Sequence, residues 1–432
     1  MKTLTRMGRV NTRARAPRRH STIVRSVARQ AASIGIAIVM GNSLALAAEP
    51  GSEESAHVQW RETMVHMETP RQGCFRAAFP STLWEEVSCH TANMHAHSVP
   101  RRPQSGLPQT TGNGVDYVLA APGLISQTVG SFPSVSGVTA ESSVGVPAFD
   151  NLGVLGPNEY TLQINTNNNS TTSACAGATD ICTVWQQFIY ATDYLGTGTA
   201  AVYMEYWLIG WGPTCPSGWA TQGIDCWTNS AYTDAPDVPI TSLGGLKMTG
   251  TAVSGGNDTV TFANGTTAYS LSAPDSVVQI GTVWKESEFN VLGDTGGSEA
   301  EFVGFPSITV NVAAQFGSTT APGCLSGAGT TGETNNLTLG SCVTAGGSTP
   351  SIQFTESITA PAPDGVGYYL AGCGVTEGGG FVGTTFAQAE AKLQSDGLTT
   401  SPPAGKPTSC GGALNYYSST GWAASEEVWF NK

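Results

Sequence analysis

Apolar and polar residues alternate along most of residues 115–360, with a period of two. Such alternation is typical of β-strands with one buried side, whereas the period of an amphipathic helix is hard to find here. β-Branched and aromatic residues fill the alternating segments, and clusters of Gly, Asn, Asp and Ser separate them. We expect strands at residues 160–165, 184–190, 202–209, 259–262, 276–280, 307–312 and 351–354.

Turn sequences support an antiparallel arrangement of these strands. Residues 254–258 (Ser-Gly-Gly-Asn-Asp) and 262–265 (Phe-Ala-Asn-Gly) resemble hairpin turns. Many short strands with turn residues between them indicate a sandwich, a jelly roll or a barrel. The fold class that we predict is all-β, a two-sheet antiparallel sandwich of jelly-roll type.

The N-terminus has the features of an export signal. Residues 1–30 are basic, and an apolar stretch runs from Ile34 to Leu46. At its end, Ala45 and Ala47 are small residues at the two positions that a signal peptidase reads. After this region no run of 18 apolar residues follows, so no membrane span is expected once the signal is cut. We therefore predict a secreted or periplasmic protein.

Composition divides the chain into four regions. The one good helical pattern after the signal lies at residues 386–395, in a stretch that otherwise has no clear pattern. A linker rich in Pro, Gln, Ser, Thr and Gly spans about 98–114. The predicted regions are a signal peptide at 1–47, an N-terminal extension and linker at 48–114, the β-sandwich at 115–360 and a C-terminal appendage at 361–432. If the extension covers the site, it would act as a pro-segment.

Ten cysteines in an exported chain predict disulfides. Metal binding is the weaker interpretation, because no CxxC motif occurs and no histidine lies nearby. The cysteines fall along the chain as five local pairs, and we expect pairing in that order. The expected disulfides are Cys74–Cys89, Cys175–Cys182, Cys215–Cys226, Cys324–Cys342 and Cys373–Cys410.

Charge and histidine content exclude several functions. Residues 1–102 hold 14 Lys and Arg against 7 Asp and Glu, whereas residues 103–432 hold 5 against 25. Such an acidic body has no basic surface for nucleic acid. All six histidines precede residue 100, so the body contains no Ser-His-Asp triad, no Cys-His dyad and no histidine-bound zinc. We expect no metal and no cofactor, and chemistry that uses carboxylates, amides, hydroxyls or lysines.

Two segments carry candidate chemistry. The first is a hairpin of residues 184–190 and 202–210, on which Tyr203, Glu205 and Trp207 share one face. A carboxylate between aromatic residues is costly to bury unless it is paired or protonated. A simpler interpretation is that Glu205 pairs with Lys285 or accepts hydrogen bonds from Tyr and Trp donors.

The second segment is residues 283–294, where Glu286, Glu288 and Asn290 share the face opposite Phe289 and Val291. A simpler interpretation makes these glutamates solvent-facing residues of an edge strand. If both segments join one sheet, however, the side chains would converge on its concave side. The converging residues would be Glu205, Glu288 and a glutamine, either Gln186 or Gln187.

The order of these motifs resembles the glutamic peptidases (eqolisins), over about residues 115–360. A glutamine on one strand precedes Tyr-Met-Glu-Tyr-Trp on the next, and Ser-Glu-Phe-Asn-Val and Phe-Pro-Ser-Ile-Thr-Val follow. Members of that family are secreted, acid-active endopeptidases built on a two-sheet jelly roll. The resemblance implies Glu288 as general acid and base, Gln187 as the partner of water and oxyanion, and Glu205 as an auxiliary carboxylate.

The resemblance also implies a polypeptide substrate, with Tyr203, Trp207 and Trp185 as substrate-binding residues, and we expect a monomer. Gln-Gln-Phe stands here in place of the family's Gln-x-Gly pattern. The catalytic position could therefore be Gln186 instead of Gln187, and one residue moves a side chain to the other face of a strand.

Two other functions fit the same residues. Residues 204–212 also resemble the nucleophile strand of jelly-roll xylanases, which would make Glu205 the nucleophile and Glu288 the acid/base of a retaining glycosidase acting on polysaccharide. That mechanism needs carboxylates about 5–5.5 Å apart. The third interpretation is a non-catalytic jelly roll that binds carbohydrate or another surface, with its aromatic residues as platform or core.

Overall fold

The structure is a computed structural model. It describes residues 50–91, 116–145, 153–194, 198–326 and 333–358, together with the backbone of strands at 365–371, 379–382, 398–399, 411–418 and 421–430. The predicted signal peptide, the linker at 98–114, the helix at 386–395 and the pair Cys373–Cys410 lie outside the described residues.

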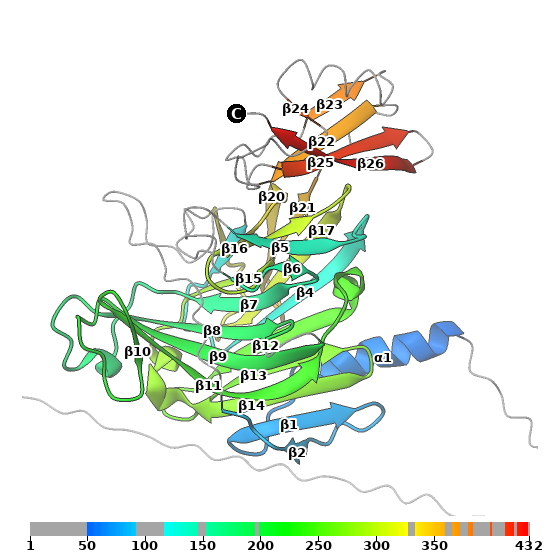
Figure 1. Ribbon diagram of the computed structural model, residues 1–432. Coiled ribbons are helices and arrows are strands. Elements are labelled where there is room, and N and C mark those ends of the chain that lie inside the picture. The colour runs from blue at the N-terminus through cyan, green and yellow to red at the C-terminus, as the bar shows by residue number, and fades with distance from the viewer. Residues whose placement is uncertain are drawn as a thin grey trace, which may run out of the picture. The chain divides into compact units, whose positions relative to one another are not determined.

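Two large antiparallel sheets pack face to face, which confirms the predicted all-β sandwich. Sheet A consists, in spatial order, of β2 (Glu85–Val87), β1 (Gly73–Ala78), β14 (Thr267–Pro274), β13 (Asn257–Asn264), β12 (Leu246–Ala252), β4 (Gln127–Ser136), β17 (Ser307–Gln315), β21 (Ser351–Ser357) and β20 (Thr338–Ala345). Sheet B consists of β10 (Ala220–Gln222), β11 (Asp225–Pro236), β9 (Thr199–Ile209), β8 (Thr183–Ala191), β7 (Tyr160–Thr166), β15 (Glu286–Gly293), β3 (Tyr117–Ala120) and β18 (Gly323–Ser326). Figure 1 shows β7, β8, β9 and β11 running in front of β12, β13 and β14.

Two smaller sheets complete the described strands. One contains β19 (Thr334–Asn335), β16 (Ser298–Phe302), β5 (Glu141–Gly145) and β6 (Gly156–Pro157). The other, near the C-terminus, contains β23 (Gly379–Val382), β22 (Gly365–Ala371), β25 (Gly411–Ser418), β26 (Gly421–Phe430) and β24 (Leu398–Thr399).

One predicted strand, at residues 276–280, is wrong. The chain there forms two 3₁₀ turns, η4 (Asp275–Val277) and η5 (Ile280–Thr282), and Gln279 between them has a left-handed φ of 58°. The Asp275 carboxylate accepts hydrogen bonds from the N–H groups of Gly255 (2.9 Å) and Gly281 (3.0 Å), which holds the turns in place. Such local side-chain bonds compete with a strand, and alternation alone does not reveal them. The other six predicted strands correspond to β7, β8, β9, β13, β17 and β21.

A helix that the sequence did not predict, α1 (Pro50–Met64), covers part of the outer face of sheet A. Its residues Trp60 and Met64 pack against Ala263 and Ala268 of the sheet. The Trp60 Nε1–H also donates to the carbonyl of Ser81 at 2.8 Å. The expectation of a single helical segment after the signal was therefore wrong, because so few apolar residues mark the buried side of α1.

The hairpin β1–β2 belongs to sheet A and also reaches sheet B. Strand β1 pairs with β14 over six residues, and the Cys74–Cys89 disulfide closes the hairpin. Immediately after Cys89, His90 forms a β-bridge with Tyr232 of β11. Two arginines form ion pairs within residues 50–91: Arg61 with Glu54 at 3.2 Å, and Arg71 with Glu86.

Four of the predicted disulfides are formed in the order expected: Cys74–Cys89, Cys175–Cys182, Cys215–Cys226 and Cys324–Cys342. Each one closes a short segment, so neighbouring cysteines along the chain are also neighbours in space. Cross-links of this kind are typical of exported proteins.

Two glycines of sheet A accept aromatic rings from sheet B. A Cβ on Gly130 would lie 2.2 Å from the ring of Phe289, and a Cβ on Gly250 would lie 2.6 Å from the ring of Phe188. Any other residue at either position would collide with the ring. The two rings therefore fix how closely β15 and β8 approach sheet A.

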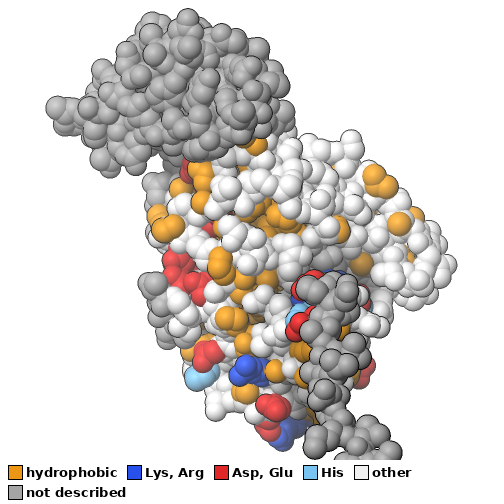
Figure 2. Space-filling model, turned by 90° about the vertical axis from the view of Figure 1, so that its right-hand side faces the viewer, with side chains coloured by type: hydrophobic (Ala, Val, Ile, Leu, Met, Phe, Trp, Pro, Cys, Tyr) orange, Lys and Arg blue, Asp and Glu red, His pale blue; other side chains and the backbone are white. Residues whose placement is uncertain are grey.

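On the face shown in Figure 2, most side chains of the described residues are uncharged, and the charged ones lie mainly in its lower half. Among the described residues, no helix is long and apolar enough to cross a membrane.

Candidate functional site

Four polar side chains form one row across the middle of sheet B. Gln187 of β8 pairs with Glu205 of β9 on one side and with Asn165 of β7 on the other, and Asn165 in turn pairs with Glu288 of β15. Residues directly opposite each other in a sheet point to the same face, so these side chains lie side by side. All four are fully buried.

The structure decides which glutamine shares this face. Gln186 points into the space between the sheets, where its Nε2 lies 3.6 Å from the sulfur of Met204. Gln187 lies on the side of Glu205 and Glu288, and Gln186 does not share that face.

Asn165 is a member of the row that sequence reasoning missed. Its Nδ2 donates to Oε2 of Glu288 at 2.9 Å. The signal for it was present in the alternation of residues 160–165, which places Gln163 and Asn165 together on one side of a strand. The pattern could not show that β7 lies between β8 and β15 in the sheet.

Aromatic residues flank the row on the same face. Trp185, Trp207 and Trp227 form a parallel row, with ring centroids 6.2 Å and 6.1 Å apart. On the other side lies Tyr203, whose ring is 4.7 Å from that of Tyr194. The three residues expected to bind substrate, Tyr203, Trp207 and Trp185, thus border the row, and all three are buried.

Glu205 is held by an indole. The Nε1–H of Trp207 donates to Oε1 of Glu205 at 2.7 Å. A short hydrogen bond to a buried carboxylate offsets part of the cost of removing it from water. This bond agrees with the simpler interpretation of Glu205 as an acceptor for Trp, and it also fixes the carboxylate next to Gln187.

Glu288 is in an environment that favours its protonated form. Burial is the main reason that its pKa lies well above the usual value, and the charge and hydrogen bond of Asp116 raise it further. The hydrogen bond from Asn165 acts in the opposite direction. Because β15 lies between β7 and β3 and Glu288 is fully buried, the expectation of a solvent-facing edge strand is wrong for this residue.

Other strands also carry buried carboxyl groups. Glu356 of β21 accepts hydrogen bonds from Asn290 (2.7 Å) and Asn335 (3.1 Å), and burial raises its pKa well above the usual value. Burial, together with the charges of Glu159 and Asp294, raises the pKa of Glu141 to about 9. Buried carboxyl groups that favour the neutral state therefore occur on three sheets, with Glu288 on β15 of sheet B, Glu356 on β21 of sheet A and Glu141 on β5.

The buried polar atoms of the site that have no hydrogen-bond partner among the described residues include Oε1 of Gln187, Oδ1 of Asn165 and Nε1 of Trp185. These residues stand on the two neighbouring strands β7 and β8 and point to one face. Buried polar atoms in proteins normally have partners, so these atoms remain available to hydrogen-bond with water or with a bound molecule.

The spacing of the two glutamates argues against the glycosidase interpretation. Glu205 and Glu288 stand three strands apart, which separates their Cα atoms by about 14 Å at the usual strand spacing. Carboxyl groups of a retaining glycosidase are about 5–5.5 Å apart. With Glu205 tied to Trp207, the pair does not have this geometry.

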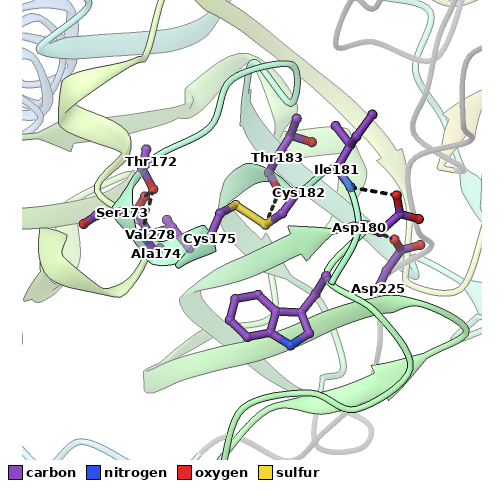
Figure 3. The surroundings of a disulfide bond; sticks show 12 residues. Thr172, Ser173, Ala174, Cys175, Asp180, Ile181, Cys182, Thr183, Asp225 and Val278 are labelled. Carbon is purple, nitrogen blue, oxygen red and sulfur yellow. Dashed lines mark hydrogen bonds between the residues drawn. A yellow bond between two sulfur atoms is a disulfide. The ribbon is translucent and has the colours of Figure 1, made fainter. Parts of the chain in front are cut away.

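A disulfide loop fixes the start of the strand that carries Gln187. Cys182, at the end of the loop closed by the bond to Cys175, directly precedes β8 (Figure 3). Within the loop, the N–H of Ile181 donates to Asp180 at 2.8 Å. Thr172 accepts from the N–H of Ala174 at 3.2 Å and so caps the short turn that contains Cys175. The loop thereby holds one end of β8.

An open cleft lies away from the row. It has a volume of about 330 Å³ and is lined by residues such as Arg76, His90, Asp234 and Tyr269, at the junction of β1, β11 and β14. None of the row residues lines it. Among the described residues, no group of three His, Cys, Asp or Glu side chains is arranged to hold a metal ion.

Comparisons of the chain with protein-family models, curated proteins and solved structures found no match.

Proposed function

We propose that the protein is a secreted endopeptidase similar to the glutamic peptidases, in which Gln187 and Glu288 activate water for the cleavage of polypeptides. The observation that supports this most directly is the row in which Gln187 and Glu288 share one face with Glu205 and Asn165. A glutamine and a glutamate suffice for this reaction without histidine or metal.

In the proposed reaction, ionised Glu288 takes a proton from water while the water oxygen attacks the carbonyl carbon of the scissile peptide bond. The resulting oxyanion accepts a hydrogen bond from Nε2 of Gln187, which has two hydrogens and gives one of them to Gln163. Protonated Glu288 then gives its proton to the leaving nitrogen as the carbon–nitrogen bond breaks. Glu288 returns to its ionised form, and Glu205 remains an auxiliary carboxylate.

The pH dependence of cleavage follows from the burial of Glu288. A general base must be ionised, and the buried Glu288 has a pKa well above 4.5. Cleavage in acid would therefore require the site to open, because contact with water returns the pKa towards its usual value. An optimum near or below pH 4.5 would indicate that Glu288 contacts water when the substrate binds, and a higher optimum would indicate that Glu288 stays shielded from water with the substrate in place.

The aromatic rows suggest how a polypeptide would lie on the sheet. Side chains two residues apart on an extended chain are separated by about 6.5–7 Å, the same repeat that separates the Trp185 position from that of Gln187. An extended substrate along β8 and β9 would therefore place apolar side chains on Trp207 on one side of the row and on Tyr203 on the other.

A second candidate is a non-catalytic jelly roll that binds a carbohydrate or another surface. The complete burial of Gln187, Glu205 and Glu288 supports it, because a sandwich that retained the fold without the activity would keep these residues enclosed. Cleavage by the wild-type protein would exclude this candidate.

The experiment that tests the proposal is cleavage of an unfolded protein by the full chain across pH 2–7. We expect cleavage by the wild type and its loss in Glu288→Gln. The matched control is Glu286→Gln, the same chemical change two residues away on the same strand. Absence of cleavage by the wild type at every pH, or equal loss in both variants, would overturn the proposed function.

A further inference from the structure

A backbone carbonyl at the end of β15 starts a chain of hydrogen bonds that leads to the row. The carbonyl oxygen of Gly293 can only accept, so the hydroxyl of Thr161, 3.0 Å away, must donate its single hydrogen to it. The Thr161 oxygen is then available only as an acceptor for its other neighbour, the side-chain amide of Gln163 at 2.9 Å.

This arrangement fixes which way the amide of Gln163 faces. Its Nε2 must point to Thr161, so its Oε1 points to the row. Oε1 accepts from Nε2 of Gln187 at 3.0 Å and from Nδ2 of Asn165 at 3.2 Å. Amide oxygens and nitrogens are otherwise hard to distinguish, and here the hydrogen-bond network assigns them.

The two neighbouring amides are oriented as a consequence. Asn165 gives its second Nδ2 hydrogen to Glu288 at 2.9 Å, so both of its donors are used. The oxygens Oε1 of Gln187 and Oδ1 of Asn165 are the remaining acceptors, on neighbouring strands, and neither has a donor among the described residues. Paired residues in a sheet have Cα atoms about 4.5–5.5 Å apart. One hydrogen-bond donor, or two donors next to each other, can therefore reach both oxygens.

We propose that Thr161 and Gln163 are positioning residues, which turn the amides of Gln187 and Asn165 so that two carbonyl oxygens face the reacting groups as acceptors. One oxygen accepts the water hydrogen that is not transferred to Glu288, and the other accepts a backbone N–H of the extended substrate. This inference rests on the proposed peptidase function and assigns Asn165 a contact with the substrate.

If the Gln163 amide were turned round, the donors and acceptors that Gln187 and Asn165 present to the reacting groups would be exchanged. An Nε2 facing the row would require Gln187 and Asn165 to present oxygens to it, and their NH₂ groups would then face the reacting water. An NH₂ group cannot accept a hydrogen from water, so the water would lose its orientation. The hydroxyl of Thr161, which touches neither the row nor the substrate position, is therefore expected to affect catalysis from a distance.

A neutron crystal structure of the full chain exchanged into D₂O tests the orientation directly. We expect both deuterons of the Gln163 amide on the side of Thr161, and deuterons of Gln187 and Asn165 directed at Gln163 Oε1. Deuterons of Gln163 directed at Gln187 would overturn the inference.

Kinetics test the effect with a matched pair of variants. Thr161→Val removes the anchoring hydroxyl, and Thr128→Val makes the same change at a buried threonine of sheet A whose hydroxyl has no partner among the described residues. We expect Thr161→Val to lower kcat about 10- to 100-fold with KM changed less than threefold, because loss of orientation reduces the rate of reaction. Thr128→Val should leave kcat within twofold. Thr161→Val should also lower the Tm, because it leaves the Gly293 carbonyl and the Gln163 amide unsatisfied, so the kcat values are compared at a temperature below the Tm of both variants.

Equal kcat values for the two variants would overturn the inference while leaving the proposed function intact. A wild type that cleaves no substrate would overturn the proposed function, and this inference with it. Active wild type, the expected deuteron positions and a kcat loss confined to Thr161→Val would together support the inference.

Discussion

The two faces of sheet B are equally buried and chemically opposite. On the side of sheet A, Ile164, Phe188, Met204 and Phe289 join the hydrophobic core. On the other side, the residues next to them in the sequence are Asn165, Gln187, Glu205 and Glu288, and these are also fully buried. The same four strands thus enclose an apolar layer and a polar layer.

This difference shows which layer stabilises the fold. Burial of apolar surface contributes about 25 cal/mol per Å² to stability. Burial of a carboxyl group costs free energy unless hydrogen bonds or protonation offset it. The pKa of Glu288 is raised because burial makes its charged form costly. Selection for stability alone would have made the second face apolar, so the polar face is where function should be sought.

The largest effect is expected from Glu288→Gln. If Glu288 transfers the proton, its amide should lower kcat about 10²–10⁴-fold. Thermal stability at pH 7 should stay the same or increase, because the amide replaces a group whose charged form is disfavoured by burial. Peptide cleavage and the Tm of the variant measure the two effects. A large fall in Tm would show that the polar face stabilises the fold and contradict the comparison.

The opposite result is expected on the core face. Phe188→Ala should reduce the free energy of unfolding by about 3–5 kcal/mol, the usual cost of removing a buried aromatic ring. Urea unfolding at constant pH measures it. Ile181→Ala is the control, because that side chain is 86% exposed and its loss should change stability little. Similar losses in the two variants would show that Phe188 does not belong to a tightly packed core.

The acidic groups predict that stability falls as pH rises. Burial raises the pKa of Glu141 to about 9 and that of Glu159 to about 8, so folding favours their protonated forms. Their contribution is complete below about pH 4.5, the unfolded value, and is lost as pH rises through 8 to 9. We expect Tm to decrease from pH 4 to pH 9, and Glu141→Gln to reduce this decrease. A Tm that increases over this range would contradict the prediction.

The smallest effect is expected from Trp207→Phe. This change removes the indole donor to Glu205 and keeps most of the ring, so it should cost about 1–2 kcal/mol of stability at neutral pH. Trp227→Phe, in the same row, is the control for loss of ring area. A difference in unfolding free energy between the two variants measures the hydrogen bond, and equal values would mean that it contributes nothing.

Local patterns in the sequence were sufficient to assign faces. Alternation placed Tyr203, Glu205 and Trp207 on one side of β9, and Glu288 and Asn290 on one side of β15. A strand has only two sides, so residue types alone decide which one is apolar. The disulfides were predictable for a related reason, because each closes a short local segment.

The order of the strands within the sheet could not be predicted from the sequence. Nothing local says that β7 lies between β8 and β15, so Asn165 was missed although its strand was predicted. Asp116, which affects Glu288, is far from it in the sequence and comes near only through β3. Contacts of this kind depend on how the whole chain closes, and periodicity within one strand carries no information about them.

The two glycines of sheet A that contact aromatic rings, Gly130 and Gly250, have a consequence for how related chains should vary. Gln187 and Glu288 are each followed by a phenylalanine whose ring lies against a glycine, Phe188 against Gly250 and Phe289 against Gly130. These contacts set the distance of β8 and β15 from sheet A. They lie on the face of sheet B that carries none of the proposed catalytic residues. Gly130 and Phe289 should therefore change only together among relatives, and a lineage that had lost Glu288 should still keep the pair.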